Sequence, residues 1–520
     1  MIMLRNLKNI AAVSLSTGAS RLLGLLRDVL IYAALGAGVW SSAFLLAFTL
    51  PNLFRRLLGE GALTSALVPV LGEVLNRDGR GAAFRFFSAV AGQVLLLLAL
   101  LTTAGMLLLG VISLTGTLDA SWSLAAKLSV LLLPYMLFIC LSAVFAAGLH
   151  VLGRFTAAAS TPIVLNLAMI LAMSGALLMG SPPEEIIYWL CGGVLLGGVL
   201  QLFIPAVDFA RQGWRPQWAR GEEAPMQDLR SLLLPALAGA AILQVNIMIS
   251  RLLAHSLNES AVSVLYLASR LMELPLGLFT ISVTTVFFPL MADHLARRDE
   301  AAFAASFSSG LRLVLGISIP AGIGLLLLGE PLLELLRFGR FEGEDAKTVA
   351  GLVSIYACGL PFYSVATFAT RGLHASKAIR CTVQIAGLCL LFNLAGSLIL
   401  MQFLAERGLA LANVLAALVQ AVLLWQALAR RHHALRLANL AQAGRKIFIS
   451  TSIMAAFCLC GLVLLHLGNL TGKLHAWIAI TALVPGGIAV YFYFLYLQGF
   501  EELNLLVGKL IKKLGPSGKH

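Results

Sequence analysis

Long apolar runs without a charged residue limit what this chain can fold into. The run from Val94 to Leu114 contains no Asp, Glu, Lys or Arg, and about 20 consecutive apolar residues are enough to cross a bilayer as a helix. The whole chain has this character, since 59% of its 520 residues are hydrophobic and 12% are charged. A soluble domain carries about a quarter charged residues. A water-soluble fold is therefore excluded.

Dividing the chain at charged, Gly, Pro and Asn clusters predicts an all-α polytopic membrane protein with fourteen transmembrane helices. A basic start followed by an apolar run is assigned to the first helix and not to a cleaved signal. The second span is interrupted by Pro51. The predicted spans lie near 10–35, 39–70, 88–114, 124–149, 157–179, 186–208, 231–254, 261–290, 310–329, 348–372, 379–402, 408–429, 447–467 and 474–497.

The 37 Lys and Arg residues, against 24 Asp and Glu, give a net charge of +13. Of these cations, 25 fall at the termini and in the loops on one side of the predicted topology, and six fall in the opposite loops. Cations accumulate in short cytoplasmic loops, so both termini are predicted to be cytoplasmic. This distribution explains the basic charge without nucleic acid as a partner.

An internal repeat is visible in four pairs of short matches. Ser20-Arg-Leu-Leu recurs at Ser250, Pro51 at Pro275, Gly148-Leu-His at Gly372, and Asn166 at Asn393. The offsets lie between 224 and 230 residues. The repeat predicts an N-lobe of six helices at 1–215, a C-lobe of six helices at 225–430, a helix pair at 445–500, and a basic cytoplasmic tail at 501–520. Two halves of equal orientation that surround a central cavity are typical of a transporter.

Six arginines lie inside the predicted spans, where each costs about 2.5–3.5 kcal/mol at the bilayer centre on insertion scales. They are Arg21, Arg27, Arg55, Arg56, Arg251 and Arg270. Some have a partner at helical spacing: Arg56 with Glu60, Arg270 with Glu273, and Arg251 on one helix face with Gln244. Asp28 is the third acid near these arginines, after Glu60 and Glu273. Six arginines against three acids leave a surplus of positive charge. Such a surplus in a cavity indicates an anionic substrate, and the planar guanidinium suits phosphate or diphosphate.

Motifs of enzymes and cofactor proteins are absent from the sequence. There is no P-loop, no HExxH, and no Ser/His/Asp constellation, and the seven cysteines form no CxxC pair. We therefore expect a transporter with no covalent chemistry, no cofactor and no metal site.

Three segments then resemble one known family: SRLLGLLRD at 20–28, FTLPNLFRRLLGEGALTSALVPVL at 48–71, and YLASRLMELPLGLF at 266–279. They are similar to the MurJ (MviN) family of bacterial lipid II flippases, in the multidrug/oligosaccharidyl-lipid/polysaccharide exporter superfamily. The resemblance continues to the last helix pair. It implies a MATE-like transporter of the bacterial inner membrane that moves undecaprenyl-diphosphate-linked disaccharide-pentapeptide from the inner to the outer leaflet for peptidoglycan synthesis.

The resemblance also assigns residues. The positions tied to function in the family match Arg21, Arg27, Asp28, Arg55, Glu60 and Arg270, and the last helix pair matches a groove for the polyprenyl tail. Arg56, Arg251, Glu273 and Gln244 are secondary cavity candidates, and Pro51, Gly59, Gly61 and Pro275 are predicted hinges. Some relatives bind sodium through carboxylates, but the span at 379–402 has no Asp or Glu, so no such site is expected. Lipid II, membrane lipids and other cell-wall synthesis proteins are the candidate partners.

Three alternatives stay open at this point. A flippase of another undecaprenyl-diphosphate-linked glycan shares the same diphosphate chemistry. A MATE-type multidrug antiporter would need cavity acids for cationic drugs, which is the opposite charge. A membrane glycosyltransferase would need catalytic carboxylates in an extramembrane loop, and the loop around 209–230 is too short for a nucleotide-sugar site.

Overall fold

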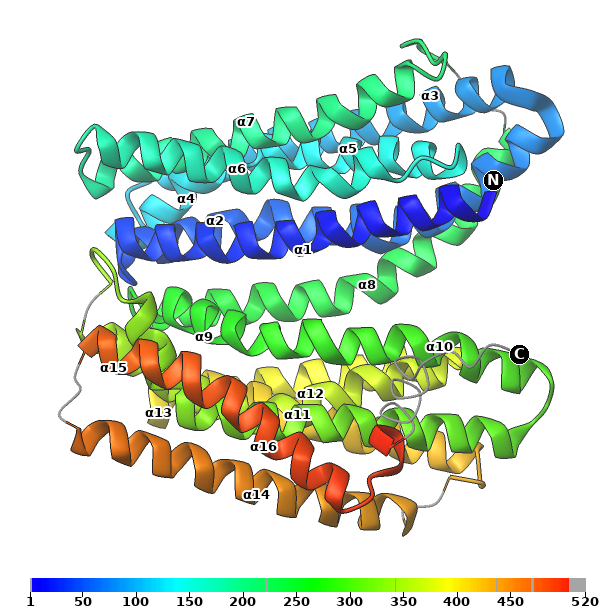
Figure 1. The fold of residues 1–520 in the computed structure, drawn as a ribbon. Coiled ribbons are helices and arrows are strands. Elements are labelled where there is room, and N and C mark those ends of the chain that lie inside the picture. Colours follow the sequence, from blue (N-terminus) through cyan, green and yellow to red (C-terminus); the bar gives the residue numbers. More distant parts are fainter. Residues whose placement is uncertain (1, 220–222, 342, 436–437, 469–471, 505–520) are drawn as a thin grey trace. The chain divides into compact units, whose positions relative to one another are not determined.

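A computed structural model describes residues 2–219, 223–341, 343–435, 438–468 and 472–504. Every regular element among these residues is helical (Figure 1). The elements are α1 (Ile2–Leu35), α2 (Val39–Phe54), η1 (Arg55–Ala62), α3 (Leu63–Leu114), α4 (Ala120–Leu132), α5 (Pro134–Val151), α6 (Thr156–Leu178), α7 (Pro183–Ala210), α8 (Glu223–Leu257), α9 (Ala261–Pro275), η2 (Leu276–Thr280), α10 (Ile281–Ala296), α11 (Glu300–Leu336), α12 (Gly343–Ala375), α13 (Ile379–Arg431), α14 (Ala438–Leu467), α15 (Gly472–Ile478), η3 (Ala479–Leu483) and α16 (Val484–Leu497).

The helices have the length and polarity of membrane spans. Within the described residues, eleven helical segments are long and apolar enough to cross a bilayer. Two of them contain a break where the sequence predicts a loop between two spans: at Gly79, whose φ is 79°, and at Ala405, whose φ is 49°. The all-α polytopic fold class is confirmed, and the chain is a multi-pass membrane protein. The count of fourteen spans stays a prediction.

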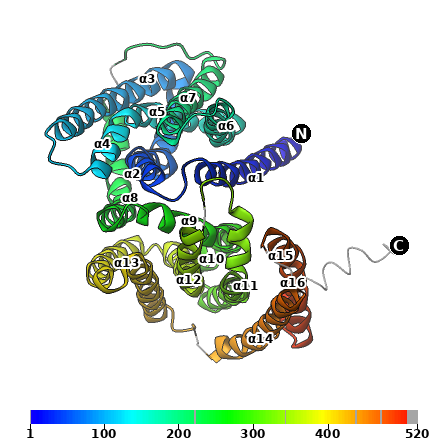
Figure 2. The same ribbon diagram turned by 90° about the vertical axis from the view of Figure 1, so that its left-hand side faces the viewer.

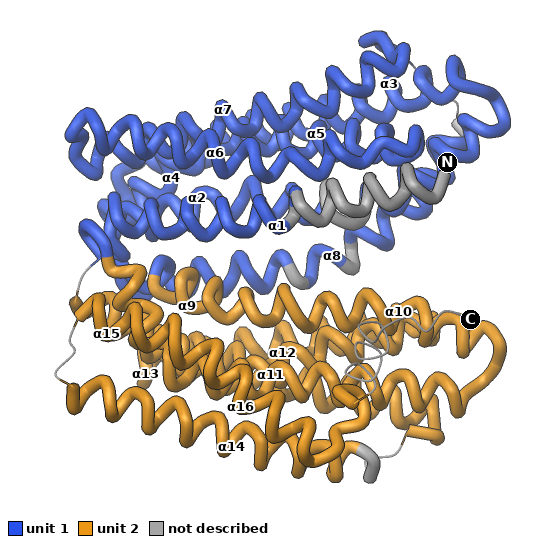
Figure 3. The backbone as a smooth tube through the Cα atoms, in the orientation of Figure 1, with its two compact units in different colours: residues 1–263, 338–341 blue, residues 264–337, 342–520 orange. Residues whose placement is uncertain are grey.

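The chain divides into two compact units (Figure 3). Unit 1 comprises residues 1–263 with 338–341, and unit 2 comprises 264–337 with 342–520. Helix α8 belongs to unit 1, where it packs against α2, α3 and η1. The lobe boundaries predicted from the repeat stay a prediction, and the predicted tail at 501–520 lies largely outside the described residues.

Unit 1 is held together by an aromatic cluster at the end of the bundle where α5 finishes. Figure 2 views the helices nearly end-on and shows α5, α6 and α7 grouped side by side. The rings of Phe87 and Phe209 lie 4.3 Å apart, and Trp214 packs edge-on against Phe145 at 5.3 Å. Gly148 allows this packing, because a Cβ atom there would lie 2.8 Å from the Phe87 ring.

Unit 2 repeats this arrangement with other residues. The rings of Phe307 and Phe368 lie 5.1 Å apart in a cluster formed by α10, α11, α12 and α13. A Cβ atom on Gly372, the repeat partner of Gly148, would lie 2.7 Å from the Phe307 ring. The glycine of each Gly-Leu-His segment therefore has the same physical role, which is to let a phenylalanine of a neighbouring helix approach the backbone.

The last helices pack against α11 through both apolar and polar contacts. Ile447, Met454, Leu483 and Leu495 share one core with residues of α11. Two polar contacts also join this region to α11. The Tyr491 hydroxyl donates to the Gly316 carbonyl at 2.6 Å, and Arg312 forms an ion pair with Glu502 at 2.6 Å. The predicted helix pair at 445–500 is thus anchored to one helix of unit 2.

Residues 338–341 pack in unit 1, although the helices before and after them in the chain belong to unit 2. The Arg340 backbone N–H donates to the Ala33 carbonyl at 2.9 Å. Phe341 is fully buried, and its ring meets that of Tyr32 edge-on at 5.6 Å. Gly339 has a φ of 60°, a conformation that glycine adopts without steric cost, and lies against the Ala33 backbone.

We predict that Gly148→Ala and Gly372→Ala each lower the thermal midpoint of the detergent-solubilised protein. The added methyl overlaps a phenylalanine ring, and overpacking costs about 1–3 kcal/mol, more than the ~1 kcal/mol that alanine gains over glycine in a helix. Gly175→Ala is the matched control, because its Cβ atom would meet nothing within 4 Å. Equal midpoints for all three variants, measured by size-exclusion after heating, would contradict this account.

Candidate functional site

The most buried charged group that the structure describes is the carboxylate of Asp28 on α1, with an exposed fraction of 1%. Its Oδ1 atom accepts hydrogen bonds from the neighbouring Arg27, from Nη2 at 2.5 Å and from Nε at 3.0 Å. The Arg27 side chain is 11% exposed. A buried carboxylate requires such a partner, because removing one member of a buried pair costs about 3–5 kcal/mol.

Asn166 on α6 completes this cluster. Its Oδ1 atom accepts a hydrogen bond from Arg27 Nη1 at 3.1 Å, and its Nδ2 atom donates to the Ser20 carbonyl of α1 at 3.1 Å. The amide therefore fixes one edge of the Arg27 guanidinium and also ties α6 to α1. The sequence offered Asn166 only as a repeat marker, although a polar residue inside a membrane span is itself a functional signal.

The predicted hinge at Pro51 lies inside α2, four residues before the helix widens into the π-helix η1. Proline cannot donate the usual helical hydrogen bond, and π-turns often accompany such disruptions at functional sites. Arg55 begins η1 and is half-buried. Its Nε atom donates to Asn52 Oδ1 at 3.1 Å, so the change in backbone geometry coincides with a candidate arginine.

Arg251 of α8 forms hydrogen bonds to α2, and its predicted place on a cavity face with Gln244 stays a prediction. Its Nη1 atom donates to the Leu45 carbonyl at 3.0 Å and also to the Thr49 hydroxyl. The Thr49 hydroxyl in turn donates to the Leu45 carbonyl at 2.6 Å. This arginine thus joins two helices through residues that lie six and two positions before Pro51. Gln244 is half-buried on the same helix as Arg251.

Unit 2 contains the remaining candidates on α9. Arg270 Nη1 contacts Glu273 Oε2 at 3.2 Å, as the i,i+3 spacing predicts, with side chains 30% and 50% exposed. Pro275 ends α9 and is followed at once by the π-helix η2. The repeat-equivalent prolines Pro51 and Pro275 are therefore both followed closely by a π-helical segment, and each lies within five residues of a candidate arginine.

The remaining candidate residues lie on α1 and η1 of unit 1. Arg21 is half-buried on α1 and Arg56 is exposed on η1. The side chain of Glu60, and those of the hinge glycines Gly59 and Gly61, lie outside the described residues, so the predicted Arg56–Glu60 pair stays a prediction. Arg27 and Asp28 are in contact, whereas we find no ion pair between Arg21 and a described carboxylate.

The site's chemistry is that of ion recognition. Among the candidates in unit 1 there are five arginines and one carboxylate whose side chain the structure describes, Asp28, so the formal charge of this set is positive. Over the described part of the chain, no three His, Cys, Asp or Glu side chains come together as metal ligands. Arginines that are positioned by a carboxylate and by neutral amides are suited to binding an anion such as a phosphate through several hydrogen bonds.

Comparison with known proteins agrees with this chemistry. The family profile described as "Lipid II flippase MurJ" matches residues 31–481. A "Probable lipid II flippase MurJ" of Rhizobium meliloti (strain 1021) is 32% identical over 509 residues, covering 96% of this chain and 95% of the relative. A "Lipid II flippase MurJ" of Burkholderia cenocepacia is 28% identical and covers 81% of this chain and 83% of its own length.

Solved structures are similar in fold. A structure titled "Lipid II flippase MurJ, inward closed conformation" has a TM-score of 0.78 at 23% identity, covering 96% of this chain and 99% of that one. An inward-facing MATE family transporter of the MOP superfamily has a TM-score of 0.65 at 13% identity and covers 80% of this chain and 95% of that one. The MATE-like architecture that the resemblance implies is confirmed. With a family profile over most of its length and a relative above 30% identity, the chain belongs to the MurJ family of lipid II flippases.

Proposed function

We propose that this chain is a transporter that moves lipid II from the inner to the outer leaflet of the bacterial cytoplasmic membrane by alternating access. Membership of the MurJ family supports this function over export of another undecaprenyl-linked glycan and over multidrug antiport. The observation that carries the proposal is Arg27, a nearly buried arginine fixed by Asp28 and Asn166 inside a helical bundle.

The diphosphate of lipid II is the part of the substrate that these arginines would bind. In the proposed cycle Arg21, Arg27 and Arg55 of unit 1 and Arg270 of unit 2 hold it, while Asp28 and Glu60 orient the arginines. The contacts of Arg27 support this division between binding arginines and orienting acids, because Asp28 occupies the Nε and Nη2 edge of the Arg27 guanidinium. Arginine forks bind phosphate oxygens with defined geometry, which a lysine does not reproduce.

Two further features are assigned by the same proposal. Pro51, Gly59, Gly61 and Pro275 would allow the helices to bend during the cycle, supported by the π-helices that follow both prolines. The pair of helices at 445–500 would accommodate the polyprenyl tail. Large apolar side chains exposed on α14 and α16, Phe448, Val463 and Ile488 among them, offer the required surface.

The proposed topology has both termini in the cytoplasm. The uneven distribution of cations between the two sets of predicted loops supports it. In this orientation the loops at the ends of α5 and α12, where the two Gly-Leu-His segments finish, are cytoplasmic. Other cell-wall synthesis proteins remain proposed partners.

We predict that this protein restores lipid II transport in a bacterium depleted of its own flippase. Lipid II in the outer leaflet is measured by its accessibility to an externally added enzyme that cleaves the exposed headgroup. Growth and outer-leaflet lipid II should both return on expression of the wild-type chain. A chain that reaches the membrane at normal levels and restores neither would refute the proposed function.

We predict that Arg27→Lys abolishes most of this rescue while the protein level stays normal. Lysine keeps the charge next to Asp28 but lacks the planar fork, so folding is preserved and diphosphate binding is weakened. The matched control is Arg77→Lys, which changes an arginine that also pairs with the next residue, Asp78, but is 56% exposed. Full rescue by Arg27→Lys would remove Arg27 from the binding set.

We predict that Asn166→Ala reduces transport about tenfold or more, because Arg27 loses a hydrogen bond that involves a charged group, worth roughly 1.5–3 kcal/mol. Asn166→Asp should reduce it as well, since a second carboxylate would compete with the diphosphate for Arg27. A merely structural Asn166 would instead lower the membrane level of Asn166→Ala and leave the transport per molecule unchanged. Transport divided by protein level separates the two outcomes.

A further inference from the structure

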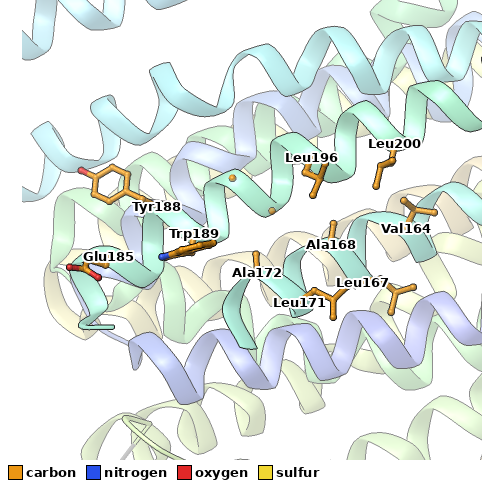
Figure 4. Close-up of a pocket in the computed structure, with 12 residues that line it drawn as sticks. Val164, Leu167, Ala168, Leu171, Ala172, Glu185, Tyr188, Trp189, Leu196 and Leu200 are labelled. Carbon is orange, nitrogen blue, oxygen red and sulfur yellow. The ribbon is translucent and has the colours of Figure 1, made fainter. Parts of the chain in front are cut away.

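An apolar groove of about 790 Å³ runs along unit 1 between α6 and α7 (Figure 4). Leucines, alanines and glycines form most of its wall, and one acid stands at its end. The lining residues are Val164, Leu167, Ala168, Leu171, Ala172, Glu185, Tyr188, Trp189, Gly192, Gly193, Leu196 and Leu200. No residue of the proposed diphosphate site is among them.

Small residues create the groove. At Gly193 the two helices touch, because a Cβ atom there would lie 2.9 Å from the Ala172 methyl and 3.0 Å from the Ala168 carbonyl. At Gly192, one position earlier, a Cβ atom would meet nothing within 4 Å. The helices therefore pack tightly along one line and leave an open channel beside it, flanked by exposed side chains such as Leu171 and Leu196.

The length of the groove matches one lipid chain. From Glu185 to Leu200 the groove follows α7 for about 22 Å at 1.5 Å per residue. Each leaflet contributes roughly half of the ~30 Å hydrocarbon core. A chain that begins at the Glu185 end therefore stays in contact with the groove through its whole leaflet.

One end of the groove is polar. Figure 4 shows Glu185, Tyr188 and Trp189 together at that end and only aliphatic side chains farther along. Tyr188 and Trp189 are 51% and 44% exposed, as is common where helices leave the bilayer. Glu185 is exposed, and it forms no ion pair with any side chain that the structure describes. An unpaired carboxylate at the mouth of an acyl-sized groove attracts a cationic headgroup.

We propose that this groove binds one acyl chain of a bilayer phospholipid whose amine headgroup contacts Glu185, the chemistry of phosphatidylethanolamine. The site is separate from the arginine site and does not depend on the transported substrate. Glu185 disfavours phosphatidylglycerol, whose headgroup carries no positive charge to offset its phosphate. A bound acyl chain supplies apolar contacts along the open channel, where α6 and α7 do not contact each other.

Glu184 provides a control for the role of Glu185. Both acids lie in the first turn of α7, where a negative charge interacts favourably with the helix dipole. Glu184 is also exposed but does not line the groove. If the two acids serve only the helix terminus, replacing either has the same effect. If Glu185 binds an amine, only its replacement changes lipid binding.

The test measures lipid retained by the purified full-length protein in native mass spectrometry, after equilibration with equimolar phosphatidylethanolamine and phosphatidylglycerol. Glu185→Gln should lower the retained ratio of the two lipids by about two- to fivefold, the range of a surface ion pair. Gly192→Leu, whose Cβ atom would meet nothing within 4 Å and whose side chain extends into the open channel, should lower total retention. Glu184→Gln and Gly175→Leu make the same substitutions at positions outside the groove, so their lipid ratio and total retention should match those of the wild type.

Several outcomes would overturn the proposal. Equal retention of the two lipids by the wild type would remove the headgroup selectivity. A ratio lowered equally by Glu184→Gln and Glu185→Gln would assign the effect to the helix terminus. Unchanged total retention in Gly192→Leu, or a change in oligomeric state without a change in lipid, would show that the groove does not hold an acyl chain. Transport in the rescued strain is measured in parallel, so failure here is distinct from failure of the proposed flippase activity.

Discussion

The hydrocarbon interior of a membrane offers no water to a polar group, and this constraint governs nearly every feature of the chain. Backbone N–H and C=O groups must bond within each span, so the described elements are all helical. Charged side chains are tolerated only where a partner compensates them. Asp28 meets this requirement through Arg27, and Arg251 meets it through a backbone carbonyl and the Thr49 hydroxyl.

Two of the exceptions to regular helix geometry lie within a few residues of a candidate arginine in the chain. Pro51 and Pro275 interrupt the helical hydrogen bonds, and a π-helix follows each one. Side chains add hydrogen bonds to the backbone beside Pro51, as when the Asn52 side-chain amide donates to the Phe48 carbonyl at 3.1 Å. A bend that needs such support is a place where two conformations can have similar free energy, which suits alternating access.

The repeat explains why two stretches of sequence with little identity build similar units. What repeats is a set of physical requirements: a glycine where a phenylalanine approaches the backbone, a proline before a widened turn, and a tyrosine that donates to a side-chain amide. Tyr135 donates to Gln201 in unit 1, and Tyr363 donates to Asn413 in unit 2. Such requirements survive substitution of the surrounding apolar residues, because many apolar side chains fill the same volume.

The sequence by itself determined the membrane class, the approximate spans, the cationic surplus and the residues that match the family, because apolar length and charge position are one-dimensional properties. It could not supply contacts between distant segments. The sequence showed Asp28 only as an acid near several arginines, and the structure pairs its carboxylate with the neighbouring Arg27. Asn166 as a partner of Arg27, the anchoring of Arg251 to α2, and the groove between α6 and α7 were decided by tertiary structure. Each arises where different helices pack together, and that packing depends on the shapes of many side chains at once.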